Sequence, residues 1–345
     1  MSQSQQNKQR EFIAVDFRGV RAASRERTSM GIVGPATIVV AATLPGPLPE
    51  LVERDPDADP RPTTIRSTAT WYGVGGEGAL AAGVYGSLGG LVRFAGTVGA
   101  DPGGDLIQSW LSERGVDVQE LRRAGSTPVQ LHLDASGYQP LTIAGDGHSG
   151  PTPEQAPAAF GEPGSTLFLA GYPYLGPMRG AGAAAVLEAA RKRGLRTVVS
   201  LSPVALGGPG APLSPSDLET VLPHTDLICG GSPELRRATR RTDLYEAARA
   251  LIAAGAGAVL ARRGVDGATV FRAGPASLDR EDTGTPAVAA ALANEPPGPY
   301  QVAAAFGAVF DAAYLLGSAL NDASPVRFAA AAATRLLRST SSFTP

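Results

Sequence analysis

The hydrophobic pattern of this chain alternates between short apolar runs and stretches whose apolar positions recur at helical spacing. Apolar runs bounded by turn residues predict buried strands, and helical spacing predicts the helices that cover them. The second half keeps this alternation most regularly, with predicted strands at 166–170, 195–201, 225–229 and 258–261 and predicted helices at 178–193, 217–222, 232 onward and 243–254. Strands that alternate with helices favour a mostly parallel sheet covered on both faces, and hence an α/β fold.

Two β-prone segments of the first half, 63–72 and 127–144, lack the helices that would connect them to a parallel sheet. The second segment contains a hairpin signal at Asp134–Gly137. We therefore predict a small separate sheet or lid built from about 44–72 and 127–144. Residues 30–43 are predicted as one buried strand that opens the main sheet.

The ends of the chain have a different character. Residues 1–29 are polar and rich in Arg, Gln and Ser, which predicts a flexible tail. Residues 30–345 are expected to form one domain. Its last part is predicted as a long loop over 279–300 followed by two helices, 303–320 and 325–338.

The stretch from Gly73 to Asp105 combines a glycine cluster, a small-residue helix and an apolar strand. Glycines before a helix let a ligand approach the backbone N–H groups. We predict that the helix ends near Gly89, that a strand follows over 91–98, and that a turn over 99–104 leads to a helix over 106–114. A ligand is expected to meet the scaffold at this stretch.

Composition narrows the function classes. The chain has 30 basic and 32 acidic residues and a net charge of -2, which gives no electrostatic case for binding nucleic acid or an anionic membrane. No apolar stretch is long enough to span a bilayer, and the start lacks the apolar core of a signal peptide, so we expect a cytoplasmic protein. The single cysteine, Cys229, lies in an apolar run and is interpreted as a buried inert thiol.

The order and spacing of several glycine motifs resemble the PfkB/ribokinase family of sugar and nucleoside kinases over about 30–338. The matching positions are Gly75-Gly76-Glu77-Gly78, Ala82, Gly89, Gly99-Ala100-Asp101-Pro102-Gly103-Gly104-Asp105, Gly115-Val116-Asp117 and Gly264-Val265-Asp266-Gly267. The resemblance implies a ribokinase-like three-layer α/β/α sandwich with a β lid that often makes dimer contacts. It also implies transfer of the ATP γ-phosphate, with Mg²⁺, to a hydroxymethyl group.

The catalytic residues of the family are replaced in this sequence. The family has a Gly-Ala-Gly-Asp run at the start of the penultimate helix, which supplies a carboxylate base and an anion hole of backbone N–H groups. The aligned run here is Ala305-Phe306-Gly307-Ala308, so the base position is Ala308. Alanine cannot accept a proton, and Phe306 places a ring where the backbone should approach phosphate.

Other polar positions of the family are also replaced, while scaffold glycines remain. The positions that the resemblance assigns to the substrate cleft are Val39, Gly75, Gly76, Glu77, Leu80 and Asp101. Those assigned to the nucleotide side are Ser202, Gly231, Glu234, Arg262, Gly264 and Gly267. Of these, Val39, Leu80, Ser202, Gly231 and Arg262 depart from the polar family residue, whereas Glu234 is the acid that supports the Mg²⁺ shell.

A few residues have two interpretations. Asp311 is either a displaced base or a surface or packing residue, and helix geometry favours the second because Asp311 lies almost a turn beyond Ala308. Arg262-Arg263 either bind an anion or are solvated at a strand end. Glu77 either faces a ligand or solvent, and Asp101 is expected to hold its turn. The histidines, His132, His148 and His224, have no metal-binding spacing.

The leading hypothesis is a PfkB-like protein whose phosphoryl transfer is lost or repurposed: a pseudokinase, or a binding or accessory protein. Its cleft would be more apolar than that of an active kinase, with a ligand less polar than a sugar and a homodimer formed through the lid. ATP and Mg²⁺ enter only under the alternative, an active sugar or nucleoside kinase with a displaced base. A third hypothesis is a non-kinase enzyme of secondary metabolism that reuses the cleft.

Overall fold

The computed structural model describes residues 29–45, 66–135, 141–144, 151–173, 178–201, 215–275, 277–283, 299–322 and 324–337. The predicted tail, apart from Ser29, lies outside the described residues, as do Ser202 and His148.

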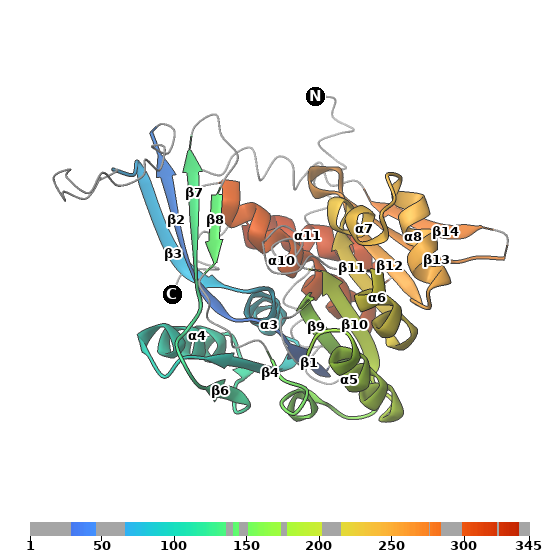
Figure 1. Ribbon diagram of the computed structural model, residues 1–345, viewed down its shortest axis with the longest axis horizontal. Helices are drawn as coiled ribbons and strands as arrows, with labels where there is room; N and C mark the ends of the chain where they lie inside the picture. Colours follow the sequence, from blue (N-terminus) through green and yellow to red (C-terminus); the bar gives the residue numbers. More distant parts are fainter. Residues whose placement is uncertain are drawn as a thin grey trace, which may run out of the picture.

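The central sheet runs in the order β14-β13-β12-β11-β10-β9-β1-β4-β5, with β6 pairing beside β4 (Figure 1). The pairs from β12 through β1 to β5 are parallel, and β13 and β14 extend the sheet in antiparallel fashion. This confirms the mostly parallel α/β sheet. Its strands are β1 (Ser29–Val33), β4 (Leu91–Val98), β5 (Val116–Asp117), β6 (Leu121–Arg123), β9 (Thr166–Tyr172), β10 (Arg196–Leu201), β11 (Leu227–Gly231), β12 (Ala258–Arg262), β13 (Ala268–Ala273) and β14 (Leu278–Thr283).

Helices cover both faces of this sheet, which gives three layers. One hydrophobic core joins a sheet face to α3 (Glu77–Ser87), α4 (Pro102–Glu113), α10 (Pro299–Ala319) and α11 (Pro325–Leu337). The other core joins the opposite face to η1 (Ala156–Ala159), α5 (Ala181–Lys192), α6 (Pro215–Val221), η3 (Leu222–His224), α7 (Ser232–Thr239) and α8 (Leu244–Ala253). Successive residues of one strand contribute to opposite cores, as Phe168 and Leu169 do in β9, because side chains alternate along a strand.

The lid is a separate sheet in the order β3-β2-β7-β8, formed by β2 (Thr37–Leu44), β3 (Ala69–Gly75), β7 (Val129–Ala135) and β8 (Leu141–Ala144). It stands at one side of the molecule in Figure 1. The predicted hairpin is confirmed by the antiparallel pairing of β7 with β8.

The prediction of one strand over 30–43 is wrong, because the chain leaves the main sheet at Gly34-Pro35-Ala36 and enters the lid as β2. Proline cannot donate to a strand ladder. A Cβ at Gly34 would lie 2.6 Å from the carbonyl oxygen of Ala170, so this bend also needs glycine.

Three other boundaries differ from the predictions. The expected turn over 99–104 contains the first turn of α4, since Asp101 caps the helix and Pro102 is its first residue. The expected loop over 279–300 begins with strand β14. Helix α10 begins at Pro299, earlier than the predicted residue 303.

Candidate active-site cleft

A cavity of about 580 Å³ lies at the carboxyl ends of β10, β11 and β12. Ligand sites in open α/β sheets lie at this edge. Helix α10 and the first residue of α3 complete its wall. The lining residues are Glu77, Ser200, Leu201, Gly231, Ser232, Pro233, Glu234, Arg236, Leu244, Arg262, Arg263, Gly264, Asp266, Phe306, Gly307 and Ala308.

The cavity brings together one part of the predicted site. The predicted residues that line it are Glu77, Gly231, Glu234, Arg262, Gly264, Phe306, Gly307 and Ala308. Val39, Leu80 and Asp101 do not line it, and neither does any described residue of the lid strands. Val39 and Leu80, which the resemblance assigns to the substrate cleft, therefore do not share this cavity with Phe306 and Ala308. Val39 and Leu80 are buried, at 4% and 6% exposure, and Leu80 belongs to the core beneath α3.

Three glycines of the predicted site, two on its substrate side and one on its nucleotide side, have structural roles. A Cβ at Gly75 would lie 2.2 Å from Cγ2 of Val39, so Val39 occupies the space beside this glycine. Gly76 is the N-cap of α3 with a φ of 81°, a conformation that favours glycine. A Cβ on Gly267, which has a φ of 98°, would likewise be strained, and Gly267 donates to the carbonyl of Gly264 in the tight turn between β12 and β13.

The aligned catalytic run lies inside α10, although the resemblance implies that it opens the helix. Since α10 begins at Pro299, residues 305–308 lie in its second and third turns. The N–H groups there point to carbonyls four residues earlier, which also belong to the helix. Only the first four N–H groups of a helix are free to bind an anion. The positions that the resemblance assigns to the anion hole, Ala305, Phe306 and Gly307, therefore have no free N–H groups, because the alanine-rich sequence before Phe306 continues the helix.

Asp311, one turn further along α10, is fully buried, so its interpretation as a surface residue is wrong and the packing interpretation is confirmed. Its Oδ2 accepts hydrogen bonds from the Ser200 hydroxyl at 2.7 Å and from Nη1 of Arg262. Asp311 itself does not line the cavity, whereas both of its partners do. The carboxylate therefore holds α10 against the ends of β10 and β12.

Arg262 is correspondingly 7% exposed, which excludes a solvated side chain at this position. Burial lowers the pKa of the guanidinium, but the charge of Asp311 and its hydrogen bond raise it further, so the pKa lies above its usual value. The side chain passes under Gly307, where a Cβ would lie 3.3 Å from Cζ of Arg262. Arg262 thus forms the floor of the cavity with its charge already paired.

Glu234 occupies the space that a side chain at residue 231 would need. A Cβ at Gly231 would lie 1.9 Å from Oε2 of Glu234. This oxygen is buried and accepts no hydrogen bond in the described structure. Helix α7 is capped by Gly231 without a side-chain hydrogen bond, and the hydroxyl of Ser232, its first residue, donates to the carbonyl of Arg262.

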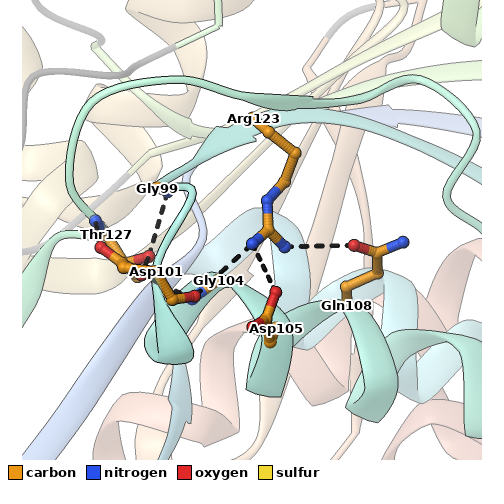
Figure 2. A network of polar contacts seen from close by, with 7 residues as sticks. All are labelled: Gly99, Asp101, Gly104, Asp105, Gln108, Arg123 and Thr127. Carbon is orange, nitrogen blue, oxygen red and sulfur yellow. Dashed lines mark hydrogen bonds and ion pairs between the residues drawn. The ribbon is translucent and has the colours of Figure 1, made fainter.

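Asp101 holds the junction between α4 and the lid, as Figure 2 shows. Its carboxylate accepts from the N–H of Gly104 at 2.9 Å, from the N–H of Thr127 at 2.7 Å and from the Thr127 hydroxyl at 2.5 Å. The hydrogen bonds from Thr127, with that from Gly104, lower the pKa of Asp101 to about 2. Arg123 adds bonds to Asp105 and Gln108 in the same network. The prediction that Asp101 holds its turn is confirmed.

The other candidate residues do not form a reactive group. Burial lowers the pKa of His132 to about 4, so this side chain in β7 is neutral at physiological pH. Cys229 is fully buried, and its burial raises the pKa of the thiol. Within the described ranges, no three His, Cys, Asp or Glu side chains are placed to hold a metal ion together. Among the described helices none is long and apolar enough to cross a membrane.

The model of the pfkB family carbohydrate kinases matches residues 49–291. The chain belongs to this family. No curated protein matches it significantly, so the comparison with relatives rests on solved structures.

The PfkB fold is shared along nearly the whole of both chains with solved structures. Ribokinase from Arabidopsis thaliana, solved with ribose and ATP, has a TM-score of 0.66 and 20% identity over 92% of this chain and 96% of its own. Phosphofructokinase-2 from Escherichia coli has a TM-score of 0.66 and 20% identity, over 92% of this chain and 95% of its own. Ribokinase from Giardia lamblia has a TM-score of 0.67 and 15% identity, over 92% of this chain and 96% of its own. At these identities the likeness establishes the ribokinase-like fold.

The PfkB family implies ATP and Mg²⁺, and the described cavity residues do not fit that pair. The N–H groups of α10 are used within the helix, and Arg262 is already paired with Asp311. Glu234 is the single family acid that remains, and a divalent ion needs several oxygen ligands. The fold of a PfkB kinase is therefore present with a different set of polar groups in its cavity.

Proposed function

We propose that this PfkB protein does not transfer phosphoryl groups and serves as a small-molecule binding or accessory protein, a pseudokinase in the broad sense. The observation that carries the proposal is the position of Ala308 within an unbroken α10. At Ala308 the helix offers neither a carboxylate to take the hydroxyl proton nor free N–H groups to hold phosphate charge.

The lining of the cavity supports a ligand less polar than a sugar. Phe306, Leu201 and Leu244 contribute to its wall. The same proposal includes a cytoplasmic location, no nucleic-acid or membrane partner, and a homodimer through the lid. Exposed Tyr72 and Val129 on lid strands β3 and β7 support the dimer, because each leaves a large apolar side chain in solvent.

The test combines isothermal titration with ribose, adenosine and ATP and a phosphate-transfer assay over a panel of sugars and nucleosides. The expected outcome is no turnover and no sugar binding in the micromolar range. ATP-dependent turnover of any member of the panel would overturn the proposal.

The alternative of an active kinase with a displaced base is examined in the same assay. Glu77 supports this alternative better than Asp311 does, because Glu77 lines the cavity whereas Asp311 is buried against Arg262. If turnover is found, its loss in Glu77→Gln with retention in Asp311→Asn would identify the base. The further alternative, another reaction in the same cleft, has no particular observation in its favour.

A further inference from the structure

Two of the cations that line the cavity lie beside carboxylates of the protein. Arg262 is paired with Asp311, which lies behind the cavity wall. Arg263 lies 3.8 Å from Oδ1 of Asp282, which lies outside the wall and is also paired with Arg280. The three lining arginines are matched in number by three lining acids, Glu77, Glu234 and Asp266, so the cavity is not basic.

Helices α10 and α7 present few free N–H groups to an anion in the cavity. The N–H groups of α10 beside the cavity are used inside the helix. At the start of α7, Pro233 has no N–H, and the Glu234 carboxylate folds back over Gly231. The positive end of a helix attracts negative charge, and here Glu234 supplies that charge. An anionic ligand at the start of α7 would meet this carboxylate.

Arg236 does not make the cavity favourable for an anion. Its guanidinium donates to the carbonyls of Ser232 and Thr242 at the exposed side of α7. Asp266, also exposed, adds another carboxylate to the rim. Among the lining residues, Oε2 of Glu234 and Nε of Arg263 are buried without a hydrogen bond, and the Glu234 carboxylate is the acceptor that is left for a ligand. A buried carboxylate oxygen is stabilised by a charged donor more than by a neutral one.

We propose that this cavity binds a small organic cation, an amine whose N–H group donates to Glu234 and whose apolar part lies beside Phe306. The proposal rests on the proposed loss of phosphoryl transfer, because it places a cation where a kinase holds a polyphosphate. Phe306 lines the same cavity and packs against Phe310, with ring centroids 5.6 Å apart, so an aromatic wall faces the ligand. Aromatic rings attract organic cations.

Three probes of similar size and different charge test the ligand class: benzylamine, benzyl alcohol and benzoate, each titrated calorimetrically into the full-length protein. Benzylamine is expected to bind at least tenfold more tightly than benzyl alcohol, and benzoate is expected not to bind. Equal or tighter binding of benzoate overturns the proposal. So does displacement of benzylamine by Mg²⁺ at lower concentration, which would assign Glu234 to a metal ion.

Variants test the site. Glu234→Gln keeps the shape of the side chain and should weaken the binding of benzylamine at least tenfold. Glu246→Gln, on the exposed face of α8, should leave this affinity unchanged. Gly231→Ala is a second variant, because its Cβ displaces the Glu234 carboxylate, and it should also weaken binding. Unchanged affinity in folded Glu234→Gln, checked by circular dichroism, overturns the assignment.

The two proposals fail in different ways. ATP-dependent turnover overturns the loss of phosphoryl transfer. Absence of both turnover and benzylamine binding overturns only the cation site and leaves the proposed function standing.

Discussion

Arg262 at the end of β12 and Asp311 in α10 are 49 residues apart in the sequence and form an ion pair inside the protein. The pair joins the sheet to the helix that carries the aligned catalytic run. It also removes from the cavity the arginine that could have bound phosphate and the one carboxylate of the described part of α10 that could have served as a base.

Replacing Asp311 by alanine should lower the free energy of unfolding by about 3–5 kcal/mol, because Arg262 would stay buried without its counter-charge. Urea denaturation measures the change. Arg249→Ala is the control, since Arg249 and Glu246 form an exposed pair whose loss should cost far less than the loss of Asp311.

A double variant separates charge from packing. Arg262→Met with Asp311→Leu should be markedly more stable than Asp311→Ala, because it removes both charges and fills the space with apolar atoms. If Asp311→Ala alone costs no more than the surface control, the buried pair does not hold α10 as described.

Replacing Ala308 by aspartate should not create kinase activity. Ala308 is 4% exposed, and its N–H lies within α10, so the new carboxylate would gain no anion hole beside it. The variant should instead have a lower melting temperature, because a charge would be buried without a partner. A coupled ADP-release assay and a thermal melt check both statements. Measurable turnover would show that the early start of α10 does not prevent phosphoryl transfer.

The Asp101 junction should make stability depend on pH in the acid range. The folded pKa of about 2 lies below the ordinary value of 3.8, so the contribution of Asp101 is complete above about pH 4 and is lost as the pH falls through 2. Asp101→Asn removes the titrating group. The stability difference between wild type and this variant should therefore be constant above about pH 4 and shrink below it, as measured by urea denaturation across pH 2–6. A difference that stays constant to pH 2 would contradict this role.

Cys229 should not react with a thiol reagent in the native protein. Its side chain is fully buried, and burial raises the pKa of the thiol, so the reactive thiolate is scarce and inaccessible. Titration with Ellman's reagent should show no fast reaction in buffer and one equivalent in guanidinium chloride, since the chain has one cysteine. Rapid labelling of the folded protein would show that the surrounding core opens readily.

The sequence by itself determined the fold family and most of the elements. Alternating apolar strands and helices predicted the parallel sheet, because burial on both faces leaves a local pattern. The glycine spacings carried the family resemblance that implied the ribokinase-like fold, and positions such as Gly76 keep glycine because they need a particular backbone conformation whatever their distant neighbours are. The absence of a carboxylate at Ala308 was equally visible in the sequence.

Only the tertiary structure decided how the polar residues are paired. Arg262, Asp311 and Ser200 are far apart in the chain and meet only when α10 packs on the sheet, and no local pattern records that contact. The early start of α10 likewise decided that its N–H groups are not available. Secondary structure follows from local periodicity, whereas the chemistry of this cavity depends on which charges neutralise each other across the fold, and that is set by long-range packing.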